Sequence, residues 1–183
     1  NLLTEIFPGA TVKIDLSLQP LKNMIAQKDN QLLGTIVLNV DISKIIGLRH
    51  KVLRPNAGIK DAYYPEDKNM DTKHFGLFME VDVMAMRNVL CCLTFIPNSY
   101  ITTPAMQLRG MATDPNFRGV GFGSKLLISS EEIIIVERGR PIPFWCNARV
   151  DAIGFYEKMG WRVASDKFEI KGVGLNQKMV KGI

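Results

Sequence analysis

The sequence has few of the residues from which metal sites and disulfide frameworks are built. Its 183 residues include two histidines and three cysteines, at spacings that match no metal-ligand pattern. Cys91 and Cys92 are adjacent, the third is Cys146, and all three lie in apolar segments. An odd number of buried cysteines indicates reduced thiols in a reducing compartment, and we expect no bound metal.

Long hydrophobic runs are also missing. No stretch approaches the roughly eighteen consecutive apolar residues of a membrane span. The first residues carry Glu5, Lys13 and Asp15, without the basic region and apolar block of a signal peptide. We therefore expect a cytoplasmic protein that does not enter the membrane. The first residue is Asn rather than Met, so the question of an upstream targeting segment stays open.

The charge is modestly basic. A net charge of +5 and a pI of about 9.2 suit a polyanionic small molecule as well as nucleic acid. The chain lacks a basic stripe interleaved with aromatic residues, so nucleic acid is not expected as a partner. The composition, 46% hydrophobic and 22% charged, is that of an ordinary globular chain. The length predicts one domain over 1–183, with 1–33 as a candidate N-terminal extension.

The hydrophobic pattern predicts a mixed α/β domain. Apolar alternation favours strands at 11–18, 34–40, 74–81, 88–96, 105–113 and 143–148, with a final pair at 161–170 and 175–183. Helical patterns cover 45–54, 118–138 and 150–159. Residues 55–73 are polar and rich in turn formers, which predicts a long loop of the kind that is often functional.

A glycine-rich stretch opens the second of these helices. NFRGVGFGSKLL, residues 116–127, fails the dinucleotide fingerprint and the P-loop pattern because Ser124 occupies a required glycine position in each. It fits R-x-x-G-x-G through Arg118, Gly121 and Gly123. First-turn N–H groups have no intrahelical partner, and glycine allows close approach, so the stretch predicts a pyrophosphate site. A glycine-rich helix start without a ligand is the alternative.

Together with WCNARVDAIGFYEKMGW, residues 145–161, this stretch resembles the two signature regions of the GNAT acetyltransferase superfamily. The second region places Asn147, Ala152, Phe155, Tyr156 and Gly160 at the family spacing. The resemblance covers about residues 34–183. It implies a central, mostly antiparallel sheet that is splayed between the fourth and fifth core strands and flanked by helices. It also implies acetyl-CoA as cosubstrate and direct transfer to a primary amine.

The resemblance also assigns the residues that bind acetyl-CoA. Main-chain groups of Met111, Ala112 and Thr113 would hydrogen-bond the pantetheine arm, and an amide there would polarise the thioester carbonyl. Amides of the loop would wrap the pyrophosphate, from Arg118, Gly119, Val120, Gly121, Phe122, Gly123 and Ser124.

The second region supplies the candidate catalytic residues. Asn147 would bond the pantetheine or a water near the sulfur, although it could equally be a strand-end turn residue. Tyr156 would protonate the departing CoA thiolate. The alternative for Tyr156 is an aromatic that only packs on the core beside Phe155, which is itself an expected cofactor contact.

Basic residues mark the expected acceptor end of the cleft. Arg49, His50 and Arg54 lie on or beside one face of the first helix, Arg109 lies on the central strand, and Arg149 follows the short strand. Together they suggest an acceptor that carries phosphate or carboxylate. Taken singly, Arg49 and Arg54 could also be solvated surface charges, and Arg149 could pair with Asp151 or Glu157.

The phrase LRHKVLRP followed by YYPED resembles a GNAT subgroup that supplies glucosamine 6-phosphate N-acetyltransferase in certain protozoa. The implied product is N-acetylglucosamine 6-phosphate, for UDP-GlcNAc synthesis. The alternatives are a GNAT enzyme for another small anionic amine and a non-catalytic acyl-CoA-binding regulator. The general base stays open among His50, His74, Asp151, Glu66 or Asp67 and a water chain. A homodimer, common in this superfamily, also stays open.

Overall fold

The computed structural model describes residues 34–80 and 88–183. The strand expected at 11–18 and the candidate extension at 1–33 lie outside these ranges, as does the last residue of the strand expected at 74–81. Among the described residues, no helix is long and apolar enough to cross a membrane.

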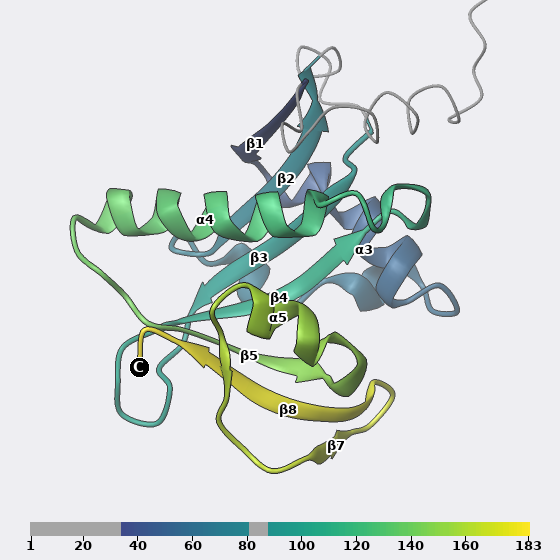
Figure 1. Ribbon diagram of the computed structural model, residues 1–183. Helices are drawn as coiled ribbons and strands as arrows, with labels where there is room; N and C mark the ends of the chain where they lie inside the picture. Colours follow the sequence, from purple (N-terminus) through teal and green to yellow (C-terminus); the bar gives the residue numbers. More distant parts are fainter. Residues whose placement is uncertain (1–33, 81–87) are drawn as a thin grey trace, which may run out of the picture.

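One mixed sheet organises this part of the chain (Figure 1). Its eight strands run in the order β1-β2-β3-β4-β5-β8-β6, and β7 also pairs with β8. The strands are β1 (Thr35–Asn39), β2 (Lys73–Met79), β3 (Cys91–Pro97), β4 (Met106–Thr113), β5 (Phe144–Arg149), β6 (Arg162–Val163), β7 (Phe168–Ile170) and β8 (Gly174–Lys181). The sheet confirms the expected mixed α/β class, although 161–170 holds only two short strands.

Helices cover both faces of the sheet. The α-helices are α3 (Ile46–Leu53), α4 (Phe122–Arg138) and α5 (Ile153–Lys158). Short 3-10 helices lie between them: η1 (Ile42–Lys44), η2 (Ile59–Ala62), η3 (Pro65–Lys68), η5 (Pro115–Phe117) and η6 (Val150–Ala152). Helices α4 and α5 bury side chains in one hydrophobic cluster, whereas α3 packs in a second cluster on the opposite face (Figure 1).

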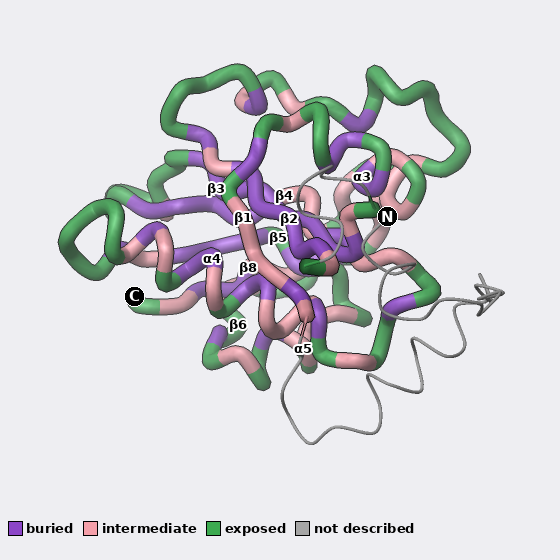
Figure 2. The backbone as a smooth tube through the Cα atoms, turned by 90° about the horizontal axis from the view of Figure 1, so that it is seen from above, coloured by how far each residue is buried: buried purple, intermediate pink, exposed green. Residues whose placement is uncertain are grey.

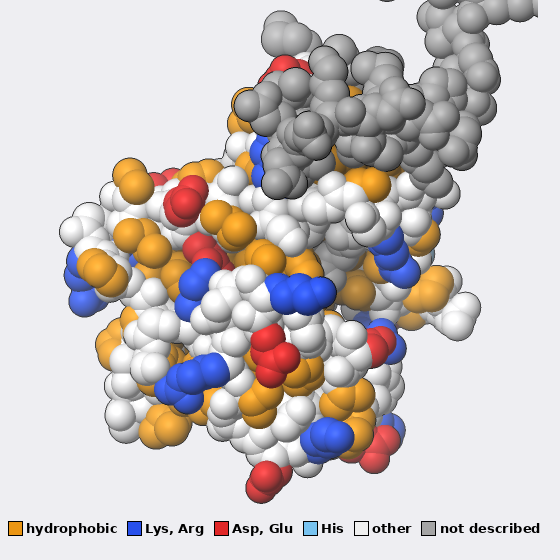
Figure 3. Space-filling view, viewed as in Figure 1, with side chains coloured by type: hydrophobic (Ala, Val, Ile, Leu, Met, Phe, Trp, Pro, Cys, Tyr) orange, Lys and Arg blue, Asp and Glu red, His pale blue; other side chains and the backbone are white. Residues whose placement is uncertain are grey.

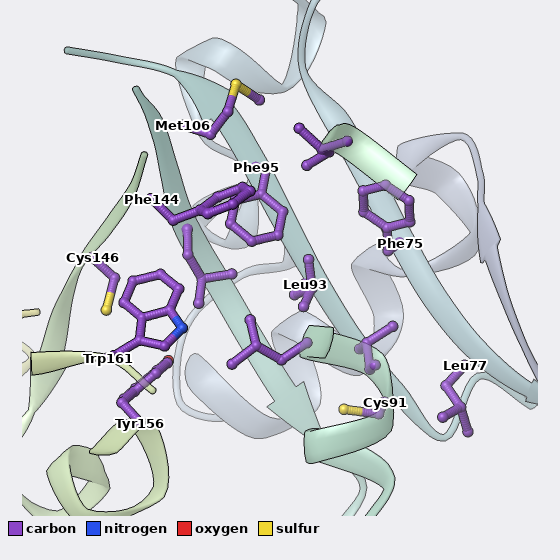
Figure 4. Packing of buried hydrophobic residues seen from close by; sticks show 14 of the residues in the cluster. Phe75, Leu77, Cys91, Leu93, Phe95, Met106, Phe144, Cys146, Tyr156 and Trp161 are labelled. Carbon is purple, nitrogen blue, oxygen red and sulfur yellow. The ribbon is translucent and has the colours of Figure 1, made fainter. Parts of the chain in front are cut away.

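Strands β2 and β3 show why two helical layers are needed. Nearly every residue of both strands is buried, so neither strand has the polar side that would face solvent. The larger cluster contains the Phe95–Phe144 ring pair, whose centroids are 5.1 Å apart (Figure 4). The buried backbone in Figure 2 follows the central strands, whereas connecting loops are mostly exposed.

Helix boundaries differ from the expectations where the backbone is not helical. The helix expected to start at Arg118 starts at Phe122, because Gly119 and Gly121 adopt positive φ angles of 78° and 87°. It ends at Gly139 as expected. Residues 55–73 contain η2 and η3 rather than an unstructured loop. The segment 150–159 is divided between η6 and α5.

The sheet opens between β4 and β5. These strands are parallel and pair only from Met106 with Phe144 to Leu108 with Cys146, whereas the other neighbouring pairs are antiparallel. Strand β4 continues to Thr113 and β5 to Arg149 without further pairing between them. The divergence confirms the splay that the family resemblance implied.

A β-bulge bends β4 just beyond this point. On β3, two residue steps separate Cys92 from Thr94, but their partners Ala112 and Arg109 are three steps apart, so β4 carries one extra residue. Gly110, within the bulge, has a φ of +62°. A Cβ there would lie 2.8 Å from Arg49 Nε. Gly110 is therefore required both by its backbone angle and by the close approach of another side chain.

We expect Gly110→Ala to cost markedly more stability than Gly139→Ala. Gly139 has a similar φ of +64°, but a Cβ there would meet nothing within 4 Å. The control should lose about 1 kcal/mol from backbone strain alone, and Gly110→Ala a further ~1–3 kcal/mol from overpacking. Urea unfolding of both variants measures the difference. Equal losses would show that the residues around Gly110 move aside freely.

Candidate active site

A cleft of about 310 Å³ lies where β4 and β5 diverge. Residues from six parts of the chain line it. They come from the end of α3 (Arg54), the following loop (Tyr64), β4 (Arg109, Met111), β5 (Asn147, Arg149) and α5 (Tyr156), with Ile170, Gly172, Val173 and Asn176 from the β7–β8 hairpin. The cleft thus brings the second motif region together with Arg54, Arg109 and Arg149, whereas the glycine-rich stretch 116–127 is not part of its lining.

The N-terminus of α4 offers free backbone donors beside the cleft. The first hydrogen bond of the helix runs from the Lys125 N–H to the Gly121 carbonyl oxygen, at 3.0 Å. Within the described chain, the N–H groups of residues 122–124 donate to no acceptor. A Cβ at Gly123 would lie 3.4 Å from Met111 Cε and 3.5 Å from Phe155 Cε2, so this turn abuts β4 and α5. The arrangement suits an anion at the mouth of the cleft.

Strand β4 supplies further unpaired backbone beyond Leu108. One edge of the strand pairs with β3, through Ala112 with Cys92 and Thr113 with Cys91. The other edge has lost its partner because β5 diverges. In a strand, successive backbone groups point to opposite edges, so alternate N–H and C=O groups around Met111 face the opening. They are placed to bond an extended ligand that enters between the strands.

Tyr156 lies between the cleft and the core. It lines the cleft, yet it is only 8% exposed. Its ring packs on Phe155 at a centroid distance of 5.1 Å and on Trp161 at 5.5 Å, and Figure 4 shows the Tyr156 and Trp161 rings together. Tyr156 therefore packs on the core and also lines the cleft. Its hydroxyl faces the Sδ atom of Met111 at 3.8 Å, a weak acceptor that a ligand could replace.

Burial controls the ionisation of Tyr156 and of the thiol beside it. Desolvation raises the pKa of Tyr156 well above its ordinary value of 10, and the adjacent Cys146 thiol adds to the effect. Desolvation likewise raises the pKa of Cys146, and it raises the pKa of Cys91 to about 12. Tyr156 is therefore a protonated donor, and the thiols are protonated too, which makes Cys146 a poor nucleophile.

Three of the predicted acceptor-binding cations line the cleft. Arg109 pairs with Glu66 at 3.3 Å, and Arg149 lies 3.7 Å from Asp151. Arg54 donates to the Leu53 carbonyl at 3.2 Å and has no carboxylate partner among the described residues. Arg54 is therefore the guanidinium whose charge is least compensated by the protein.

His50 lies away from the cleft lining. Its Nε2 atom is 2.8 Å from the carbonyl oxygen of Ala57, so the imidazole ties the end of α3 to the turn that follows Pro55. Asn147, in contrast, lies where it was expected, exposed and on the cleft wall at the diverging end of β5.

Arg49 is buried under the cleft rather than facing it, contrary to expectation. Its side chain is 1% exposed. The guanidinium donates to Asp67 Oδ2 at 2.6 Å, to Thr94 Oγ1 at 2.5 Å and to the Ala62 carbonyl at 3.1 Å. Leu48 and Arg49 are both on the side of α3 that meets the sheet. The ion pair with Asp67 makes this burial tolerable.

His74 completes the buried network. Its Nε2 atom lies 3.2 Å from the Asp67 carbonyl, which only accepts, so Nε2 carries the proton. Nδ1 then accepts from Thr94 Oγ1 at 2.9 Å, and that oxygen in turn accepts from Arg49. Burial lowers the pKa of His74 and keeps it neutral, which removes His74 as a solvent-facing general base.

Several cleft residues were not singled out in the sequence, although Tyr64 belongs to the YYPED phrase and to the loop at 55–73. Tyr64 sits in a polar loop, and the segment from Ile170 to Asn176 shows only the turn that joins β7 to β8. Asn176 is 1% exposed, and its side-chain amide donates to Gly174 C=O at 2.6 Å. The alternation and the glycines predicted this hairpin, but nothing in it indicated that its inner side would face β4.

Comparisons with known proteins agree with this geometry. The sequence model of the acetyltransferase (GNAT) domain family matches residues 79–163. The chain is similar to the uncharacterized N-acetyltransferase YitI of Bacillus subtilis, with 30% identity over 148 residues, which cover 79% of this chain and 94% of YitI.

Solved structures share the fold at low identity. A putative N-acetyltransferase from Lactobacillus plantarum superposes with a TM-score of 0.63 and 20% identity, covering 80% of this chain and 95% of that one. An aminoglycoside 6'-N-acetyltransferase complexed with coenzyme A superposes with a TM-score of 0.59 and 14% identity, covering 80% and 96%.

We expect His74 to make stability fall as the pH drops from 7.5 to 5.5. The folded-state pKa lies below the ordinary value of 6.5, so the unfolded chain takes up the proton first, and acid favours unfolding. His74→Asn keeps an acceptor for Thr94 but removes this titration, so its free energy of unfolding should change less across that range. His50→Asn, at the only other histidine, is the control. An undiminished loss in His74→Asn would exclude His74 as the source.

Proposed function

Because the chain belongs to the GNAT acetyltransferase family and is an acyl-CoA-dependent N-acetyltransferase, we propose that it acetylates the primary amine of a small anionic acceptor. The observation that carries the proposal is the cleft between β4 and β5, where Tyr156 and free backbone groups meet Arg54, Arg109 and Arg149. Glucosamine 6-phosphate is the first acceptor to test. We expect the enzyme to act in the cytoplasm, with a homodimer as the oligomer to look for.

The proposed acetyl-CoA site uses backbone more than side chains. The free N–H groups at the start of α4, with the loop from Arg118, would hold the pyrophosphate. A Cβ at Gly119 would meet nothing within 4 Å, so this loop leaves room for the phosphates. The open edge of β4 at Met111–Thr113 would bond the pantetheine arm, with Asn147 and Phe155 at its sides.

The proposed chemistry is direct transfer within a ternary complex. The neutral amine attacks the thioester carbonyl, a C–N bond forms, the C–S bond breaks, and an amide of β4 stabilises the oxyanion. Tyr156 donates its proton to the departing thiolate, and the nitrogen gives up its own proton to solvent or a cleft carboxylate. Because the pKa of Tyr156 is raised, this donation accompanies C–S cleavage rather than preceding it.

The charges in the cleft support an anionic acceptor. Guanidinium groups bind phosphate and carboxylate with two parallel hydrogen bonds, and here they come from three separate elements. Glu66 and Asp151 already partner two of them, which leaves Arg54 as the strongest candidate for the anionic group. A phosphorylated amino sugar supplies both an amine and a phosphate at a fixed separation.

We expect Tyr156→Phe to lower kcat about 100-fold, the lower range for loss of a general acid. The KM for acetyl-CoA should change little, because the ring keeps its contacts with Phe155 and Trp161. The assay is CoA-thiol release with glucosamine 6-phosphate, glucosamine and a panel of other amines. Tyr100→Phe removes a hydroxyl bonded to the Ala164 carbonyl and is the control. Full activity in Tyr156→Phe would exclude it as the acid.

We expect Arg54→Ala to raise the KM for glucosamine 6-phosphate by about 10–100-fold, which corresponds to one charged hydrogen-bonded contact. The KM for unphosphorylated glucosamine should stay within about twofold, since no phosphate contact is lost. Arg140→Ala, an exposed arginine just beyond α4, is the control. Equal effects on both sugars would place the anionic group elsewhere in the cleft.

A further inference from the structure

Tyr64 lines the cleft and is held in place by several neighbouring groups. Its ring lies 4.0 Å from the Arg109 guanidinium carbon and 4.5 Å from that of Arg49, measured to the ring centroid. Its hydroxyl makes no hydrogen bond with the described residues, although it belongs to a side chain that lines the cleft. The ring therefore has a fixed position and an unused polar group.

The backbone of Tyr64 is held from inside the protein. Its N–H donates to Asp67 Oδ2 at 2.8 Å, and the same oxygen accepts from Arg49 Nη1 at 2.6 Å. The side chains of Arg49 and Asp67 are each 1% exposed. The buried ion pair thus fixes the turn that presents Tyr64, and through it the start of η3.

The β4 bulge fits against the same ring. A Cβ at Gly110 would lie 3.1 Å from Tyr64 Cε2, so the absent side chain provides the space that the ring occupies. The preceding residue, Arg109, lies over the ring and pairs with Glu66 of the same loop. Loop, bulge and buried arginine are therefore shaped around one aromatic side chain.

The ion pair is not arranged for maximal stability. Within the described chain, Arg49 Nε and Asp67 Oδ1 are buried without a hydrogen-bond partner. Buried ion pairs often contribute little net stability, because desolvation offsets the attraction, and an apolar pair of similar size can serve as well. Unlike an apolar pair, this pair also hydrogen-bonds its surroundings: Arg49 donates to the Ala62 carbonyl and to Thr94, and Asp67 accepts from the Tyr64 N–H.

We infer that Tyr64 contacts the acceptor and determines its specificity, and that Arg49 and Asp67 are positioning residues for it. The inference rests on the proposed function, since it concerns the acceptor side of the same cleft. A ring face with a free hydroxyl offers apolar contact and a hydrogen bond together, which suits the carbon skeleton and hydroxyl groups of a cyclic polyol amine. Arg109, stacked on the ring, then lies next to the bound acceptor.

The first test compares Tyr64→Ala and Tyr64→Phe with Tyr63→Ala, its exposed neighbour outside the cleft lining. Tyr64→Ala should raise the acceptor KM about tenfold or more, from loss of an aromatic contact. The KM for acetyl-CoA should stay within about twofold, Tyr64→Phe should show an intermediate loss, and Tyr63→Ala should resemble the wild type. An unchanged acceptor KM in Tyr64→Ala overturns the inference.

The second test separates positioning from stability. Asp67→Asn should lower the melting temperature, because it leaves Arg49 charged and buried without its partner. The double variant Arg49→Met, Asp67→Leu should regain stability but still lack an acceptor for the Tyr64 N–H. If Arg49 and Asp67 position Tyr64, the acceptor KM of the double variant should stay raised while calorimetry shows normal acetyl-CoA binding. Recovery of the acceptor KM together with stability overturns the positioning role.

Wild-type turnover decides the proposed function separately. Acetylation of an anionic amine sustains that function whatever the Tyr64 variants do, and if another amine in the panel is preferred, the variants are compared with that amine. Failure to acetylate any amine overturns both the proposed function and the inference.

Discussion

The separation of β4 from β5 is the constraint on which the active site depends. The two strands are hydrogen-bonded from Met106 to Leu108 on one side and from Phe144 to Cys146 on the other, and then diverge. A buried strand edge without a partner is costly unless a ligand satisfies it. Here the unpaired edge opens into a cleft, and α4 begins beside it with its own free N–H groups. In the proposed acetyl-CoA site, an extended ligand with amide groups and a pyrophosphate would satisfy both.

The bulge at Gly110 links this opening to the opposite face of the sheet. Because the bulged residue lacks a side chain, Arg49 can approach β4 from below, and Tyr64 can approach from the loop. The solvent-facing surface of α4 is mixed: Figure 3 shows hydrophobic side chains over α4 among basic and acidic ones, and Ile128 and Val136 are 41% and 79% exposed. The extended polar network lies inside the fold, where side chains from Arg49 to His74 hydrogen-bond one another instead of water.

The sequence predicted the two motif regions more completely than the positions of the basic residues near the cleft, for a physical reason. The R-x-x-G-x-G pattern and the spacing from Asn147 to Gly160 involve residues that are close in the sequence, so they can be recognised without knowledge of the fold. Arg49 and His50 lie on a helix whose burial depends on partners far along the chain, such as Asp67, eighteen residues later. Helical spacing shows which residues are neighbours but not which face meets the sheet. The YYPED phrase contains Tyr64 but does not show that its ring reaches the cleft, and the β7–β8 hairpin reaches the cleft only through tertiary folding.

Burial gives Tyr156 a role that neither packing nor acidity explains alone. Desolvation raises its pKa, so a free tyrosinate in this position is unfavourable and the proton is held until a strong acceptor forms. The CoA thiolate would be released into the same desolvated surroundings, where its own basicity rises for the same reason. The two shifts would act in opposite directions on the transfer. A buried tyrosine is therefore a suitable acid for a buried thiolate, and the aromatic contacts that hold the ring, with Phe155 and Trp161, also keep the hydroxyl dry.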